Sequence, residues 1–211
     1  MGTIKQGILG GFSGKVGGVV GAAWKGIAYM RALPVSVANP QSAGQIEQRT
    51  KFSNVTSYAS VILATIIKPL WDRFAQGQSG YNAFISKNIA LFEDTLPLPV
   101  TEFVISQGKM ASTVISSVDI TVGQKLITVH WPDDSGSGFK LSTDEVFLVV
   151  HNTSGINIGF AGAEAIRSEL SASVTMAEGV EAGDLIRVYL AFRRADGTVV
   201  SDTKFKAETA T

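Results

Sequence analysis

The chain has 211 residues, of which 45% are hydrophobic and 17% are charged, and this length suffices for one large domain or two small ones. Its 18 basic and 18 acidic residues balance, so the net charge alone indicates neither a nucleic-acid partner nor a membrane. There is no cysteine, which excludes disulfides, thiolate metal sites and a cysteine nucleophile, and the two histidines are too few for a histidine-rich metal centre.

Residues 1–38 form a glycine-rich arm, in which nine of the first 26 residues are glycine. Gly10, Gly14 and Gly18 have the four-residue spacing of a close-packed helix face. Each interior glycine, however, costs a helix about 1 kcal/mol in water, so we favour an extended ribbon or hairpin. Because the arm has too few large side chains for a core, it needs a surface outside itself. That surface belongs either to the rest of the chain or to a neighbouring subunit.

Residues 39–96 are predicted to be helical. Asn39 is a candidate N-cap and Pro40 fits the first helical position, so a helix of about 26 residues is expected to begin there. Pro69 should end or kink it. Ser79 can cap a second helix. The apolar positions expected to face the core are Ile46, Phe52, Val55, Ala59, Ile62, Leu63 and Ile66 in the first helix, and Phe84, Ile85, Ile89 and Phe92 in the second.

Residues 97–211 are predicted to form an antiparallel β-sandwich of the immunoglobulin or fibronectin kind, so the fold class is α+β. Leu96-Pro97-Leu98-Pro99 is stiff and marks the boundary before it. Seven short apolar runs separated by turn residues are typical of a sandwich, and the missing disulfide favours the fibronectin type. The expected strands are Ser112–Val122, Lys125–Trp131, Glu145–Asn152, Ile158–Ala165, Ser171–Met176, Asp184–Arg193 and Val199–Lys206.

The neutral total hides two oppositely charged halves. Residues 1–100 have nine basic and four acidic residues, whereas residues 101–211 have nine and fourteen. This asymmetry is either ordinary variation or a basic face directed at an acidic partner, which would be nucleic acid or the sandwich of another copy.

Motifs of common enzymes are absent from the sequence. Gly14-Lys15 is followed by Val16 rather than serine or threonine, so it is not a phosphate-binding loop, and neither a dinucleotide fingerprint nor a nucleophile elbow occurs. His130 and His151 lie on predicted strands and are expected to be half-buried structural residues. Asp133-Asp134 and Asp144-Glu145 are interpreted as solvated loop pairs, with weak calcium binding as the alternative. We therefore expect no enzyme, no metal and no cofactor.

Basic and aromatic residues alternate in the front half of the chain. Single-stranded nucleic acid can bind to such a pattern, because its bases stack on aromatic side chains while its phosphates pair with neighbouring cations. The aromatic side chains here are Phe12, Trp24 and Tyr29. The plainer interpretation is that the aromatic side chains anchor packing and the cations are solvated. The cations in question are Lys15, Lys25, Arg31, Arg49 and Lys51.

The apolar runs at residues 8–24 and 55–67 are shorter than the roughly 20 residues that a membrane span needs, so no span is expected. No secretion signal is evident at the first residues.

Several short motifs make the chain resemble an uncharacterised bacterial and phage family of about this length. The resemblance is carried by Gly11–Gly17, Trp24-Lys25-Gly26, Asn39-Pro40, Gln48-Arg49 and Ser79–Phe84. It implies a glycine-rich arm, a long helix and a β-rich C-terminal domain, and it brings no catalytic residue. Related Trp-Lys-Gly arms occur in proteins that resemble phage virion components.

We therefore expect a non-enzymatic structural subunit, most plausibly of a phage head or tail, which is made in the bacterial cytoplasm and located in the virion. Its partners would be further copies or other virion subunits. A nucleic-acid-binding module and a carbohydrate- or surface-binding sandwich remain as alternatives, as does a cytoplasmic location. The residues expected at the subunit interface are Phe12, Gly14, Gly17, Gly18, Gly21, Trp24, Gly26 and Tyr29.

Overall fold

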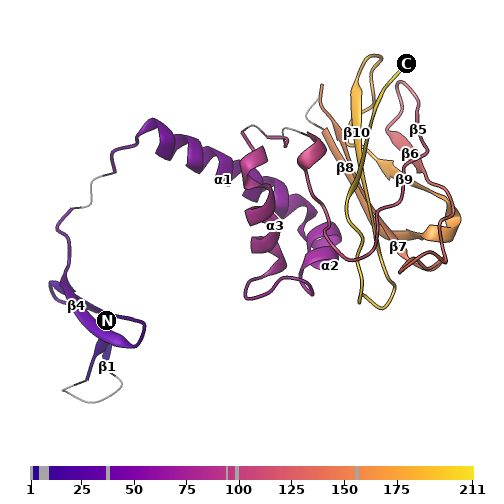
Figure 1. Ribbon diagram of the computed structural model, residues 1–211. Coiled ribbons are helices and arrows are strands. Elements are labelled where there is room, and N and C mark those ends of the chain that lie inside the picture. The colour runs from indigo at the N-terminus through magenta and orange to yellow at the C-terminus, as the bar shows by residue number, and fades with distance from the viewer. Residues whose placement is uncertain (1, 5–9, 37–38, 94, 98–99, 155–156) are drawn as a thin grey trace. The chain divides into compact units, whose positions relative to one another are not determined.

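The computed structural model describes residues 2–4, 10–36, 39–93, 95–97, 100–154 and 157–211. They belong to two compact units, an N-terminal unit of Met1–Ser42 and a C-terminal unit of Ala43–Thr211 (Figure 1). The proposed linker residues 98–99 and the expected turn residue at 155 lie outside the described ranges.

The N-terminal unit is an antiparallel sheet. Its strands β1 (Thr3–Ile4), β2 (Phe12–Val16), β3 (Val19–Trp24) and β4 (Ile27–Ala32) are neighbours in chain order. The expectation of an extended arm rather than a helix is thereby confirmed. Two-residue turns join the last three strands, and in the second turn Lys25 and Gly26 both have positive φ, at 50° and 83°. Such a turn matches the twist of a hairpin, and it explains a glycine after Trp24-Lys25.

The first helix begins later than the sequence predicted. The first helix, α1, spans Ala43–Ile62, because Gln41 has a φ of 46° and interrupts the run that Asn39 and Pro40 were expected to start. A π-helical turn, η1 (Leu63–Ile67), and a short helix, α2 (Lys68–Trp71), follow it. Pro69 thus lies within a continuing helical path. The wider turn just before it accommodates a residue that has no N–H to donate.

Ser79 caps the next helix as expected. Its side-chain oxygen accepts a hydrogen bond of 3.2 Å from the backbone N–H of Asn82 at the start of α3 (Gly80–Asn88). The 3-10 turns η2 (Ile89–Leu91) and η3 (Val100–Glu102) come after it. The predicted apolar face of the first helix is only partly correct, because Ile46 and Phe52 are exposed and burial begins at Val55.

The sandwich has the seven predicted strands, in two antiparallel sheets. One sheet has the order β5-β6-β9 and the other the order β11-β10-β7-β8, which confirms the predicted sandwich. The last strand begins at Lys204 rather than Val199, because Ser201 and Thr203 instead form hydrogen bonds with the segment around Ser106. The strands are β5 (Ser117–Ile120), β6 (Leu126–His130), β7 (Glu145–Asn152), β8 (Asn157–Ile166), β9 (Ser171–Thr175), β10 (Leu185–Arg193) and β11 (Lys204–Thr209), with the 3-10 turn η4 (Arg167–Glu169) between β8 and β9.

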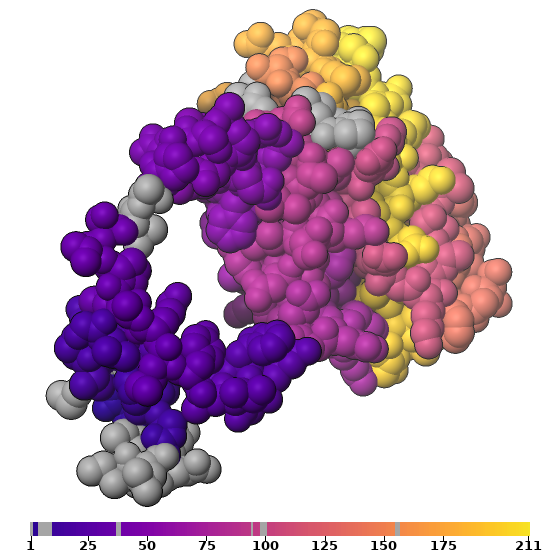
Figure 2. Space-filling model, turned by 60° about the vertical axis from the view of Figure 1, so that its left-hand side comes forward, coloured from indigo at the N-terminus to yellow at the C-terminus, as the bar shows by residue number. Residues whose placement is uncertain are grey.

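The larger sheet is buried on both faces. Its inner face, with Leu148 and Val188, packs against the smaller sheet. Its outer face, with Phe147 and Tyr189, packs against the helices. In the space-filling view the helical segment, in purple and magenta, and the C-terminal residues, in yellow, appear on one face of the C-terminal unit, with pink residues that follow the helices between them (Figure 2). The helices, which the sequence suggested as a domain separate from the sandwich, therefore share an apolar core with the outer face of the larger sheet, and a second core lies between the two sheets.

Candidate assembly interface

Strand register divides the N-terminal sheet into two faces. Residues directly opposite each other in a ladder lie on the same face, and so do residues two apart along a strand. Trp24 is opposite Ile27, and Ala22 is opposite Tyr29. Val20 lies between Lys15 on one neighbouring strand and Arg31 on the other. We call this side the aromatic face, and it consists of Lys15, Val20, Ala22, Trp24, Ile27, Tyr29 and Arg31.

The aromatic face is largely open to solvent. Trp24 is 66% exposed, Ile27 68% and Tyr29 46%. Within the described part of the N-terminal unit, no apolar side chain is buried, and the only buried position is Gly21. A sheet of this size normally needs an apolar face packed on another element for stability. The N-terminal sheet therefore presents an apolar surface typical of an interaction site.

The opposite face contains the only tight packing in the described part of this sheet. The ring of Phe12 lies against Gly21, where a Cβ atom would be 2.3 Å from the Phe12 carbonyl oxygen and 2.6 Å from the ring. A side chain at position 21 would therefore separate β2 from β3. The remaining expected glycines are placed differently: Gly14, Gly17 and Gly26 have positive φ, and a Cβ atom on Gly18 would meet nothing within 4 Å.

The predicted basic residues divide between the two units. Lys15 and Arg31 lie on the aromatic face, and Lys25 has its ammonium 4.8 Å from the centroid of the Trp24 ring. Arg49 and Lys51 instead lie on α1. Lys51 is 2.8 Å from Glu47 and 3.2 Å from Glu93, and these hydrogen bonds raise its pKa. The positive charge of Lys51 is therefore largely neutralised by carboxylates of the same chain.

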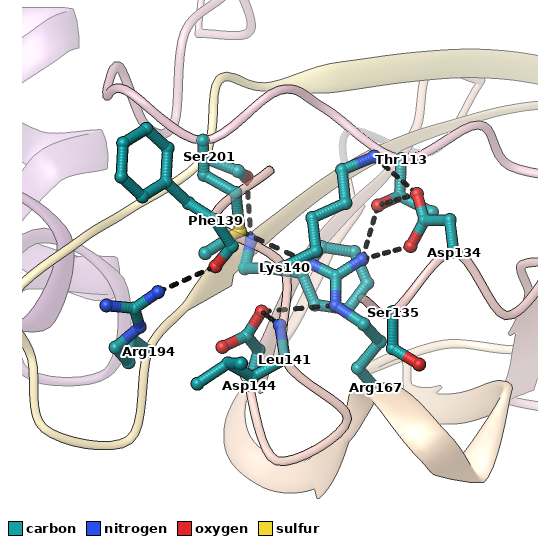
Figure 3. Close-up of polar contacts among 12 residues, drawn as sticks. Thr113, Asp134, Ser135, Phe139, Lys140, Leu141, Asp144, Arg167, Arg194 and Ser201 are labelled. Carbon is teal, nitrogen blue, oxygen red and sulfur yellow. Dashed lines mark hydrogen bonds and ion pairs between the residues drawn. The ribbon is translucent and has the colours of Figure 1, made fainter. Parts of the chain in front are cut away.

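The most extensive buried polar cluster surrounds Arg167 (Figure 3). Its guanidinium donates to Thr113 and Asp134, approaches Asp144 at 3.2 Å and lies 3.9 Å from the ring centroid of Phe192. The Arg167 side chain is fully buried, as is Asp144. The interpretation of the two acidic pairs as solvated loops is therefore wrong for these two aspartates.

The carboxylate of Asp134 pairs with two cations, Lys140 and Arg167, and is therefore not free to bind a metal ion. Burial acts to raise its pKa, but hydrogen bonds from Lys140 and Thr113 and the charge of Arg167 outweigh this and keep the pKa below its ordinary value. Among the described residues, no group of three or more metal-ligating side chains is close enough to hold an ion. The Arg167 cluster thus fixes the loop 131–144 to the sandwich.

Each of the two histidines contacts another side chain of the C-terminal unit. His151 is fully buried in β7, and its Nε2 is 2.6 Å from the hydroxyl oxygen of Tyr58 on α1. Burial, and to a lesser extent the charge of Arg187, lowers the pKa of His151 to about 3, so the ring is neutral. His130 is partly exposed and pairs with Asp119 at 2.9 Å. His151 is more deeply buried than expected, because β7 is covered on both faces.

Comparison with known proteins gives a family and a weak structural likeness. Residues 11–206 match the model of a family described as of unknown function, DUF6266. The solution structure of the fibronectin type-III domain of human fibronectin type III domain containing protein 3 is similar over 50% of this chain and 94% of that domain, with 15% identity and a TM-score of 0.28. No curated protein matches the chain. None of the helices in the described ranges has the length and apolar character to cross a membrane.

Proposed function

We propose that this chain, which belongs to the DUF6266 family, is a non-enzymatic structural subunit of a larger assembly whose N-terminal sheet makes the contacts between subunits. One observation carries the proposal: a four-stranded sheet exposes Trp24, Ile27 and Tyr29 on one face and, among its described residues, buries no large apolar side chain of its own. Each such side chain gains about 1.5–3 kcal/mol when it is fully buried. An assembly partner would supply that burial.

Within this proposal, the assembly is a phage virion, in its head or tail. The support is the resemblance of the Trp24-Lys25-Gly26 arm to arms of phage virion components. The chain would then be made in the bacterial cytoplasm and incorporated into particles. Mass spectrometry of purified particles from a phage that encodes it tests this location, and its absence from those particles would refute it.

Light scattering coupled to size exclusion tests the subunit role. The full-length protein is expected to form an oligomer, and the triple variant Trp24→Ser, Ile27→Ser, Tyr29→Ser is expected to be monomeric. A matched control removes three exposed apolar side chains from the C-terminal unit, by Val114→Ser, Leu126→Ser and Phe139→Ser. The control should still assemble. A full-length monomer at high concentration would contradict the proposal.

A second candidate function is the binding of single-stranded nucleic acid. Lys15 and Arg31 lie on the same face as Trp24 and Tyr29, which combines phosphate-binding charge with stacking surface. If this function is correct, binding weakens steeply with salt and is lost in the variant Lys15→Glu, Arg31→Glu. Unchanged migration of labelled strands with the wild-type protein at low salt would exclude it.

A further inference from the structure

The sandwich has a groove on its open side, between the edge strands β8 and β9. Its volume is ≈ 300 Å³, at the lower limit of the roughly 300–1,000 Å³ of ligand pockets, so it has room for one or two side chains. Its lining consists of Val146, Leu148, Ala161, Glu164, Ala165, Glu169, Ser171, Ala172 and Ser173.

Small side chains explain why the groove is there. Ala161 and Ala165 on β8 and Ala172 on β9 leave space where larger residues would fill the gap between the two sheets. At its base, Val146 and Leu148 belong to the apolar core between the sheets. The surface that the groove exposes is mainly polar, because Val146 and Leu148 are themselves buried, and an entering side chain would contact the alanines and the polar residues of the walls.

The charges of the groove and of the N-terminal unit are opposite. Glu164 and Glu169 line the groove, and both are exposed. The N-terminal unit has four basic and no acidic residues in its sequence. Since the whole chain has 18 of each, the C-terminal unit has a net charge of −4. A basic sheet and an acidic groove are complementary in charge.

Charge also disfavours the simplest alternative, in which two copies pair their aromatic faces. Such a pairing would bring Lys15 and Arg31 of one copy near the same cations of the other, with no carboxylate side chain in the sequence of either N-terminal unit to compensate. Like charges brought together across an interface cost free energy and direct a surface to a different partner.

We propose that the groove between β8 and β9 receives the aromatic face of the N-terminal sheet of a second copy of this chain. Trp24, Ile27 or Tyr29 would insert beside the alanines of β8 and β9, while Lys15 and Arg31 would pair with Glu164 and Glu169. This inference rests on the proposed subunit role and names the surface that the N-terminal sheet contacts. The contact joins two different surfaces, so it continues from subunit to subunit into a ring or a filament.

The natural absence of cysteine allows a direct test in the full-length chain. Two single variants, Tyr29→Cys and Ala165→Cys, are mixed and oxidised. A disulfide-linked dimer of the two variants is expected. The matched control replaces Ala165→Cys with Ala207→Cys, an exposed alanine on β11 at the opposite edge of the same sheet. The control mixture should form about tenfold less of the mixed dimer, since the correct pair is held together by docking.

Charge reversal provides a second readout. The variant Glu164→Lys, Glu169→Lys is expected to raise the concentration for half-assembly by about tenfold or more. The control Glu178→Lys, Glu181→Lys makes the same change in net charge at exposed residues away from the groove, and should assemble as the wild type does.

The outcomes separate this inference from the subunit role. If assembly depends on Trp24 and Tyr29 but neither the cross-link nor the charge reversal has its expected effect, the subunit role stands and the groove is not the docking surface. If a single chain that carries both Tyr29→Cys and Ala165→Cys forms only an internal disulfide, the groove receives the sheet of its own chain, and the inference is overturned. A wild-type monomer would overturn both.

Discussion

Tyr58 and His151 join α1 to β7 through a buried hydrogen bond of 2.6 Å between the tyrosine hydroxyl oxygen and Nε2 of the histidine. The two residues are 93 positions apart, and both are fully or almost fully buried. Nδ1 of His151 has no hydrogen-bond partner among the described residues. This pair connects the helical segment to the outer face of the larger sheet, and it makes the stability of the C-terminal unit depend on pH.

We predict that the free energy of unfolding falls as the pH drops below about 6.5. The folded protein holds His151 neutral down to a pKa of about 3, whereas the unfolded chain takes up the proton near pH 6.5. The unfolded state therefore binds more protons in this window, and stability is lost at up to about 1.4 kcal/mol per pH unit. Urea denaturation at pH values of about 7.5 and about 5 measures this loss.

Two variants control the pH experiment. Tyr58→Phe combined with His151→Leu removes the buried titration without leaving a lone polar partner, so the dependence above a pH of about 5 should be much weaker. His130→Asn removes the partly exposed histidine and should retain the wild-type dependence. An undiminished slope in the double variant would show that His151 is not its source.

The Arg167 cluster is predicted to be the most costly polar site to break. Arg167→Met leaves Asp144 fully buried without its cation, and removing one member of a buried ion pair costs about 3–5 kcal/mol. Lys206→Met, which breaks a partly exposed pair with Glu208, should cost at most about 1 kcal/mol. Chemical denaturation compares the two. Adding Asp144→Asn and Asp134→Asn to Arg167→Met should restore part of the loss, and no recovery would contradict this account.

Gly21 is predicted to be essential for the N-terminal sheet, whereas Gly18 is not. Gly21→Ala places a methyl group 2.3 Å from the backbone oxygen of Phe12 and should separate β2 from β3. Gly18→Ala meets no atom within 4 Å. Trypsin cleavage at Lys15, Lys25 and Arg31 should be several-fold faster in the first variant only, since opening of the sheet exposes these bonds. Equal rates in the two variants would refute the role of Gly21.

Loss of the N-cap of α3 is predicted to destabilise the protein less than loss of Arg167. Ser79→Ala removes the hydrogen bond to the Asn82 N–H and should lower the free energy of unfolding by about 1 kcal/mol. Ser79→Asp retains an oxygen acceptor and should be close to the wild type. Thermal unfolding of both variants measures the difference, and an alanine variant as stable as the aspartate variant would contradict the capping role.

Local patterns in the sequence predicted most of the secondary structure. Short apolar runs and the turn residues between them located all seven strands of the sandwich, because turn signals at this spacing leave room for strands but not for long helices. Ser79 was recognisable as a cap from its residue type and position. The cost of glycine in a helix predicted an extended arm, and β2, β3 and β4 are extended.

The start of α1 was wrong because the positive φ of Gln41 interrupts the run after Pro40, and the burial of Ile46 and Phe52 was wrong for a different reason. Periodicity shows which residues share a face of a helix, but not how far along the helix a neighbouring element covers that face. Asp134 and Asp144 were misjudged in the same way. Their partner Arg167 lies 33 and 23 residues away, and nothing near either aspartate in the sequence indicates it.

The sequence by itself determined the strands, the second helix cap and the shortage of core-forming side chains in the arm, because each depends on residues close together in the chain. Only the tertiary structure decided that the helices share a core with the larger sheet of the sandwich, that Arg167 gathers two distant aspartates, and that Trp24 and Tyr29 lie on one face with Lys15 and Arg31. Those relationships depend on strand order, register and burial, which arise when segments far apart in the sequence pack together.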